Sequence, residues 1–242
     1  GGAGSPNNLG IFLLNESGTN VLTSSNFNNI GNDPVETLRF ENNGSFGTDH
    51  FNFSILNFEG PNPDLLKYVL FGNAAINEYD TYSSTTYGHA NAAGAEAVGA
   101  AFYLQTPEFG VDPAQIEGFS SAGGTPILFN TNGDRLLEPE VRQKPEITAP
   151  DGTTNTFFGG DRDGDGFPNF SGTSAAAPHA AAVAALMLDA APGTSPDVIY
   201  QTLEQTAMDM ADPFTPGFDE GFDFGTGFGL LQADAAIEAL ID

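Results

Sequence analysis

Alternating hydrophobic and polar positions predict short β-strands in the first third of the chain. Residues 51–55, FNFSI, alternate strictly between apolar and polar side chains, which is the period of a half-buried strand. Residues 10–25 contain two strand-like runs separated by a polar, glycine-containing turn and therefore predict a hairpin. Residues 33–40 and 65–72 supply two further candidate strands. Several short strands at this spacing favour a small all-β sandwich over residues 1–82.

The pattern changes near residue 81, where alanine becomes frequent. Residues 118–124 and 145–153 resemble short strands that end in glycine or proline turns, as the strands of an α/β sheet do. Three helical segments are then expected: one from Ser174 to the APG at 191–193, one with Ser195 as N-cap and Pro196 at its first position, and one over 233–241. We therefore expect an α/β domain over residues 83–242.

Charge and composition narrow the classes of function. The 242 residues include six basic and 32 acidic ones, a formal net charge of −26, which argues against a nucleic-acid partner because phosphates require Lys and Arg. There is no cysteine, so disulfides and thiolate metal sites are excluded. No run approaches the roughly 20 apolar residues of a membrane span. The first residues resemble neither a signal peptide nor a natural start, so we expect a fragment with chain missing upstream.

The segment FSGTSAAAPHAAAVAALML, residues 170–188, places Ser174 at the predicted start of an apolar helix. The first N–H groups of a helix have no partner within it, and they lie at the positive end of the helix dipole. Such donors stabilise a developing oxyanion. Small neighbouring residues would also let a substrate backbone approach closely, so Ser174 is a candidate nucleophile.

The sequence GTSAAAPHAAAVAAL around Ser174 resembles the serine signature of the subtilisin-like serine peptidases. The residues that match the pattern of that family are Gly172, Thr173, Ser174, Ala176, Pro178 and Ala182. Further segments resemble the family in order and approximate spacing: AVGAAF at 97–102, FSSAGG at 119–124, KPEITAPDG at 144–152 and GTGFGLLQADAA at 225–236. The resemblance implies the C-terminal part of a subtilisin-like α/β fold, with a parallel sheet and flanking helices, preceded by an inserted sandwich.

By that resemblance Ser174 is the nucleophile of a serine endopeptidase that acts on protein or peptide substrates through an acyl-enzyme. The Asp and His of such a triad precede the serine in the chain. His50 is expected to face solvent from a strand and His179 to be a packing residue, while the sequence that follows His89 departs from the family's catalytic histidine motif. Asn73 is expected to end a sandwich strand rather than to serve as the oxyanion asparagine. We therefore expect the Asp, His and Asn upstream of Gly1, and the isolated chain to be inactive.

Two other functions are alternatives to the peptidase. The first is a catalytically dead subtilisin scaffold that acts as a calcium-dependent binding or adhesion module, and an upstream Asp and His would discriminate against it. The second, an α/β-hydrolase, is disfavoured because GTSAA lacks the second glycine of G-x-S-x-G. The resemblance and the acidic, cysteine-free composition favour an extracellular or cell-surface bacterial location. Substrate preference and oligomeric state are left open.

The loop DRDGDGFPN is the candidate metal site. Asp161, Asp163 and Asp165 alternate and Gly166 is sixth, as in the first half of an EF-hand calcium loop. The twelfth position is Gly172 rather than a bidentate glutamate, so a complete EF-hand is excluded. We expect either a structural Ca²⁺ site that needs a distant further ligand, or an acidic surface turn.

Overall fold

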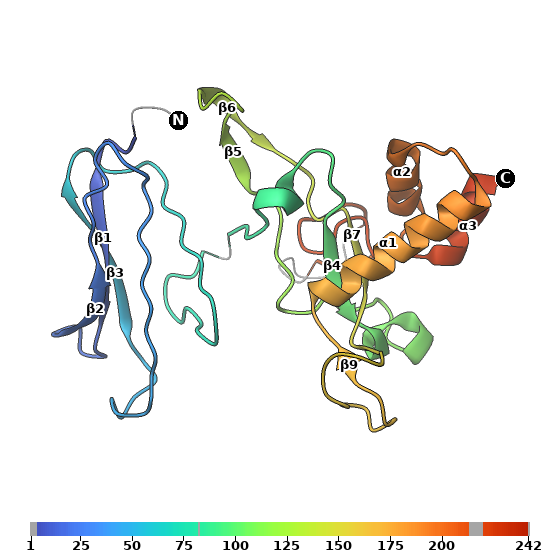
Figure 1. The fold of residues 1–242 in the computed structure, drawn as a ribbon, viewed down its shortest axis with the longest axis horizontal. Coiled ribbons are helices and arrows are strands. Elements are labelled where there is room, and N and C mark those ends of the chain that lie inside the picture. Colours follow the sequence, from blue (N-terminus) through green and yellow to red (C-terminus); the bar gives the residue numbers. More distant parts are fainter. Residues whose placement is uncertain (1–3, 82, 213–219, 242) are drawn as a thin grey trace. The chain divides into compact units, whose positions relative to one another are not determined.

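A computed structural model of the chain describes residues 4–81, 83–212 and 220–241 (Figure 1). It divides into two compact units. The first consists of Gly1–Ala74 together with Phe129–Leu137, and the second of Ala75–Leu128 together with Glu138–Asp242. The expected domains of residues 1–82 and 83–242 stay a prediction.

The first unit contains a three-stranded antiparallel sheet in the order β2-β1-β3. Its strands are β1 (Asn8–Leu14), β2 (Val21–Ser25) and β3 (Asn52–Glu59). The predicted hairpin is confirmed, and its turn is closed by Asn15 Oδ1, which accepts hydrogen bonds from the backbone N–H groups of Thr19 and Asn20. Most of the alternating segment, residues 51–55, lies in β3. Phe53 remains 38% exposed, so the apolar face of this strand is only partly buried.

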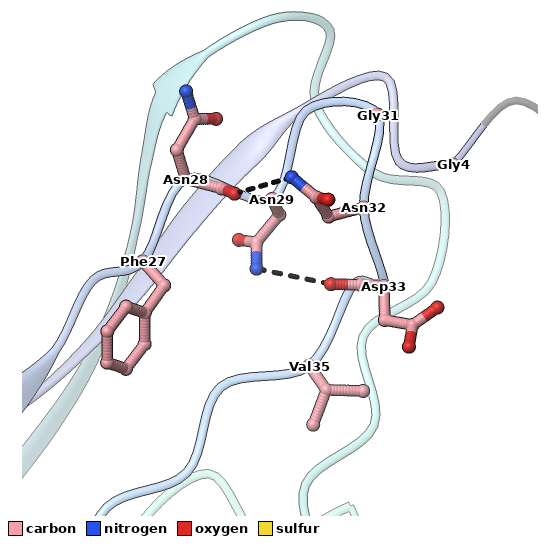
Figure 2. A pocket seen from close by; sticks show the side chains of 8 residues that line it. All are labelled: Gly4, Phe27, Asn28, Asn29, Gly31, Asn32, Asp33 and Val35. Atoms are coloured by element: carbon pink, nitrogen blue, oxygen red, sulfur yellow. Dashed lines mark hydrogen bonds between the residues drawn. The ribbon is translucent and has the colours of Figure 1, made fainter.

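The predicted sandwich is not confirmed. Residues 33–40 and 65–72 form no strand, so these two strand predictions are wrong. Residues 33–40 instead begin in a turn region where Asn29 donates to the Asp33 carbonyl at 3.3 Å and to the Glu36 carboxylate at 3.2 Å. A pocket of about 580 Å³ lies at this turn (Figure 2); its lining residues are Gly4, Phe27, Asn28, Asn29, Gly31, Asn32, Asp33 and Val35.

The second unit is built on two parallel strands, β4 (Val98–Phe102) and β7 (Ile147–Asp151), paired in register from Val98 with Ile147 to Phe102 with Asp151. Helix α1 (Thr173–Ala190) packs on both strands (Figure 1). Parallel strands covered by a helix confirm the predicted α/β class. The main core of this unit is formed mostly by small and aliphatic side chains: Ala100, Ile147, Ala149, Ala176, Ala180, Met187, Ile199, Leu203, Leu231 and Ala236.

The three predicted helices are confirmed. Besides α1, they are α2 (Pro196–Thr206) and α3 (Ala233–Ile241), and both α1 and α2 pack on α3. Ser195 caps α2 by accepting a hydrogen bond from Val198 N at 3.4 Å. No helix in the described ranges is long and apolar enough to cross a membrane.

Short elements complete the second unit. The segment 145–153 is the predicted strand β7, whereas residues 118–124 form no strand. There Gly123 packs so closely on the chain that a Cβ atom would lie 1.4 Å from the Lys144 carbonyl oxygen, so glycine is required at that position. The remaining elements are η1 (Gly88–Asn91), η2 (Tyr103–Gln105), η3 (Pro107–Phe109), β5 (Pro126–Phe129), β6 (Arg135–Val141), β8 (Thr153–Thr154) and β9 (Asn169–Phe170).

Candidate active site

Ser174 is the second residue of α1, and its side chain is exposed. The residue before the helix, Gly172, has φ 112° and ψ 164°, a conformation that favours glycine. Its carbonyl accepts the first hydrogen bonds of the helix, from Ala175 N at 2.8 Å and Ala176 N at 3.2 Å. The N–H of Ser174 therefore precedes the first intrahelical bond and is available as an oxyanion donor.

The strand end and the helix start are joined by a short β-ribbon. After β7, Thr153 and Thr154 of β8 pair antiparallel with Phe170 and Asn169 of β9. Gly152 N donates to the Phe170 carbonyl at 2.9 Å, and Asn169 Nδ2 donates to the Gly152 carbonyl at 3.1 Å. The ribbon thereby returns the chain from the carboxyl end of β7 to Ser174, although 21 residues lie between Gly152 and Ser174.

Asp151, the last residue of β7, contacts Gly172, the residue that precedes α1. Its side chain is fully buried, and its Oδ2 accepts a hydrogen bond from Gly172 N at 2.5 Å. Burial, followed by the negative charge of Asp151, raises the pKa of Glu117, while Arg162 acts in the opposite direction. Sequence reasoning treated Asp151 only as part of the KPEITAPDG resemblance, because a contact between residues 151 and 172 leaves no local pattern.

A pocket of about 240 Å³ opens beside the start of α1. It is lined by Thr153, Thr154, Asn155, Phe157, Phe170, Ala175, Pro178 and His179. His179 Nε2 lies 3.4 Å from Thr153 Oγ1, and its Nδ1 is buried with no hydrogen-bond partner among the described residues. Helix α1 thus contributes both Ser174 and one wall of this pocket. His179, which was predicted to be a packing residue, lies in that wall, and its packing role stays a prediction.

The other candidates from the sequence lie at exposed positions. His89 is exposed on η1, and His50 is exposed and lies 3.4 Å from the Asp49 carboxylate. Asn73 is exposed and ends no strand, so its expected place at a strand end is wrong. Among the described residues of the second unit, neither His89 nor His179 forms a hydrogen bond with the Ser174 hydroxyl.

The three aspartates of the predicted metal loop are brought together. Asp161, Asp163 and Asp165 are exposed, and each offers a carboxylate oxygen within 4.8 Å of the others. Hydrogen bonds from Asn169 Nδ2 at 2.9 Å and the Tyr103 hydroxyl at 2.8 Å hold Asp163 and lower its pKa. Carboxylate oxygens at this spacing suit a hard divalent cation.

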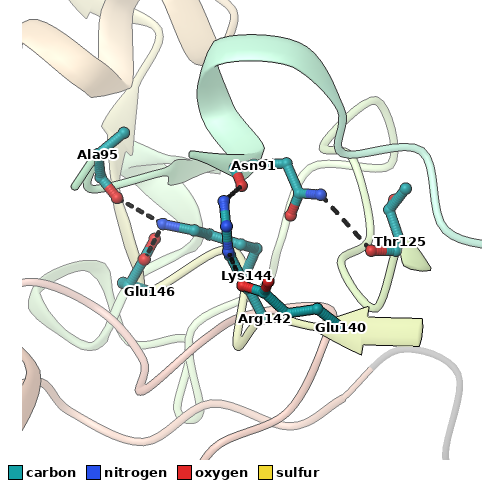
Figure 3. A network of polar contacts seen from close by, with 7 residues as sticks. All are labelled: Asn91, Ala95, Thr125, Glu140, Arg142, Lys144 and Glu146. Atoms are coloured by element: carbon teal, nitrogen blue, oxygen red, sulfur yellow. Dashed lines mark hydrogen bonds and ion pairs between the residues drawn. The ribbon is translucent and has the colours of Figure 1, made fainter. Parts of the chain in front are cut away.

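A buried charge network braces the opposite end of β7 (Figure 3). Lys144 is 2% exposed and donates to the Ala95 carbonyl and to Glu146 Oε1, while Glu146 Oε2 accepts from Ala97 N at 2.7 Å. Burial is the main cause that raises the pKa of Glu96 to about 8, with the charges of Glu146 and Glu204 adding to it. The network fixes the loop before β7, whereas Asp151 lies at the strand's far end.

Fold and site together define an α/β protein with a candidate serine nucleophile at a helix N-terminus. The chain belongs to the subtilase family, whose model matches residues 39–229. The resemblance found in the sequence is thereby confirmed. The match begins inside the segment that was predicted to be an inserted sandwich, and it includes β4, β7 and the start of α1.

Relatives of the chain are longer than the chain itself. It is 34% identical over 125 residues to a thermostable alkaline protease of Halalkalibacterium halodurans. The aligned region covers 51% of this chain and 32% of the relative. Fervidolysin from Fervidobacterium pennivorans, a keratinolytic enzyme related to subtilisin, is 26% identical with a TM-score of 0.42, over 62% of this chain and 20% of that one. The psychrophilic subtilisin-like protease Apa1 from Pseudoalteromonas sp. AS-11 is 30% identical with a TM-score of 0.26, over 31% and 16%. The chain thus spans about a third of the curated relative that it matches.

Proposed function

We propose that the chain supplies the nucleophile of a serine endopeptidase that hydrolyses protein substrates. The observation that carries this proposal is the exposed Ser174 at the start of α1, with its own N–H ahead of the first helical bond, in a chain of the subtilase family. A serine in the middle of a helix would not combine a free hydroxyl with free amide donors. Ser174 combines both, as acyl transfer requires.

The proposed chemistry has two steps. A general base takes the proton of Ser174 Oγ as this oxygen attacks the peptide carbonyl carbon, and the resulting oxyanion is stabilised by the Ser174 N–H. The base then protonates the leaving amine, which leaves an acyl-enzyme on Ser174, and water hydrolyses the ester. We assign the base and its orienting carboxylate to residues outside 1–242, since no hydrogen bond joins the Ser174 hydroxyl to His89 or His179 among the described residues of the second unit.

A fluorophosphonate probe tests this assignment, because it phosphonylates activated serine hydroxyls. We expect Ser174 to be labelled in the natural full-length polypeptide and the label to be absent from Ser174→Ala. Loss of the histidine alone costs roughly 10⁶-fold in turnover in subtilisin, so the isolated 242-residue chain should label very slowly. A full-length protein that is not labelled would contradict the peptidase and favour a catalytically dead scaffold that binds surfaces. Rapid labelling of the isolated chain would contradict the assignment of the base.

We also propose that Asp161, Asp163 and Asp165 bind a structural Ca²⁺. Their mutual spacing within 4.8 Å supports this, as does the affinity of Ca²⁺ for clustered carboxylates. Bound Ca²⁺ would hold the loop that leads into β9 and α1. With [Ca²⁺] at about 100 times Kd, binding to the folded state adds about 2.7 kcal/mol of stability.

Thermal unfolding in CaCl₂ and in EDTA tests the calcium proposal. We expect the melting temperature of the natural polypeptide to rise with Ca²⁺, and the rise to vanish in the double variant Asp161→Asn, Asp165→Asn. Asp197→Asn, an exposed aspartate in the first turn of α2, is the matched control and should keep the full rise. An equal rise in the double variant would place the ion elsewhere.

We further propose that the protein is located at the cell surface or in the extracellular space. Its support is the family and the acidic, cysteine-free composition. Fractionation of the source cells, with an antibody against this chain, should find the protein in the medium or on the envelope. Recovery only from the cytosol would contradict it.

A further inference from the structure

Among the described residues, the buried carboxyl group of Asp151 makes one hydrogen bond, and its partner is Gly172, the residue that precedes α1. Asp151 is 0% exposed, and its Oδ2 lies 2.5 Å from Gly172 N. Its other oxygen, Oδ1, is buried and has no hydrogen-bond partner in the described structure. A buried carboxyl group is costly to leave incompletely paired, so a side chain of this kind points to a function beyond packing.

Gly172 cannot cap α1 by itself. It has no side chain, and no side-chain cap bond is present at this helix start. Asp151 supplies a carboxylate there from a different element, the end of β7. A carboxylate at a helix N-terminus interacts favourably with the helix dipole, and its hydrogen bond with a backbone N–H is charge-assisted.

The two backbone groups of Gly172 are held from opposite sides. Its N–H is bonded to Asp151, and its carbonyl accepts from Ala175 and Ala176 in α1. The peptide units between these bonds carry the Ser174 N–H and set the direction of the Ser174 side chain. A shift of Gly172 would therefore move both the nucleophile and the oxyanion donor, and misplacement of reacting groups by about 1 Å can cost roughly 100-fold in rate.

We propose that Asp151 is a positioning residue for acyl transfer, which acts through Gly172 to hold Ser174 Oγ and the Ser174 N–H in reacting geometry. This inference rests on the proposed peptidase function and extends it to a residue that does not touch the substrate. Asp151 contributes no proton and forms no bond with the reacting atoms. It acts as a rigid link between the parallel strand β7 and the helix that carries the nucleophile.

The test compares Asp151→Ala and Asp151→Asn with wild type in the natural full-length polypeptide, using a fluorophosphonate over a range of concentrations up to saturation. We expect Asp151→Ala to lower the maximal rate of Ser174 phosphonylation by about 10- to 100-fold, the effect of one hydrogen bond to a charged group, while half-saturation is unchanged. Asp151→Asn keeps an acceptor oxygen and should recover part of the rate. In ¹⁵N-glycine-labelled protein, the Gly172 amide proton should be shifted downfield in wild type and move upfield in Asp151→Ala.

Asp223→Ala is the matched control. The Asp223 carboxylate is also largely buried, and it accepts hydrogen bonds from Gly225 N and Thr226 N at 2.6 and 2.7 Å. Its loss should lower the melting temperature without changing the phosphonylation rate or the Gly172 signal. An Asp151→Ala variant with the wild-type rate, or an Asp151→Asn variant no faster than Asp151→Ala, would overturn the inference. Wild type without label at Ser174 would overturn the proposed function itself.

Discussion

At the scale of single residues, burial is the main influence on the pKa of three carboxyl groups in the second unit. Glu96, Glu146 and Glu204 all have a raised pKa, and burial is the largest cause in each case. One buried cation, Lys144, faces this group and bonds directly only with Glu146 among the three. Glu96 Oε1 is buried and has no hydrogen-bond partner in the described ranges, so its neutral form is favoured in the folded protein.

This burial gives the protein a stability that depends on pH. Glu96 has a pKa of about 8 in the folded protein against an ordinary value of 4.5, so the unfolded chain releases its proton first as pH rises. Folding is therefore favoured below pH 4.5, and that contribution is lost as pH rises towards about 8. Glu96→Gln removes the ionisation. The variant should exceed wild type in unfolding free energy by about 1–2 kcal/mol at pH 9, a value reduced for partial exposure, and by much less at pH 4.

Urea unfolding of the natural polypeptide at pH 4 and pH 9 measures this difference. Glu238→Gln, an exposed glutamate on α3, is the control and should change stability little at either pH. If the stability difference between Glu96→Gln and wild type were the same at both pH values, the ionisation of Glu96 would not be coupled to folding.

At the scale of elements, local signals predicted the helices well and the strands less well. The cap Ser195 and Pro196 mark the start of α2 by contacts within four residues, which a sequence displays directly. A strand needs a partner, and residues 33–40 and 65–72 have strand-like patterns without one. Residues 118–124 are fixed instead by long-range bonds, such as Gly123 N with the Phe224 carbonyl at 2.7 Å.

The residues of the candidate site also fall into two groups, those that a short sequence motif reveals and those that only long-range contacts bring together. Ser174 and the three aspartates of the acidic loop were found because each belongs to a short motif. Asp151 was not singled out, because its partner Gly172 is 21 residues away and the contact depends on the ribbon between them. Lys144 and Glu146 were also missed as a buried pair, since charged residues are mostly exposed and their burial depends on chain segments distant in sequence.

At the scale of the whole molecule, the net charge of −26 produces an electrostatic repulsion that opposes folding. The 32 acidic residues greatly outnumber the six basic ones, and few of the described carboxylates have a cation within 4 Å. Compaction brings like charges together, which destabilises the folded state. Added salt screens that repulsion, since the Debye length falls from about 10 Å at 0.1 M to about 3 Å at 1 M.

We therefore expect NaCl to raise the melting temperature of the natural polypeptide even in EDTA, where no Ca²⁺ is bound. A triple variant that neutralises three exposed glutamates outside residues 161–165, Glu108→Gln, Glu220→Gln and Glu238→Gln, should be more stable at low salt and respond less steeply. Calorimetry from 0.05 to 1 M NaCl measures both slopes. A melting temperature that did not rise with NaCl, or equal slopes in the two proteins, would mean that the carboxylates are screened already and that the charge excess does not limit stability.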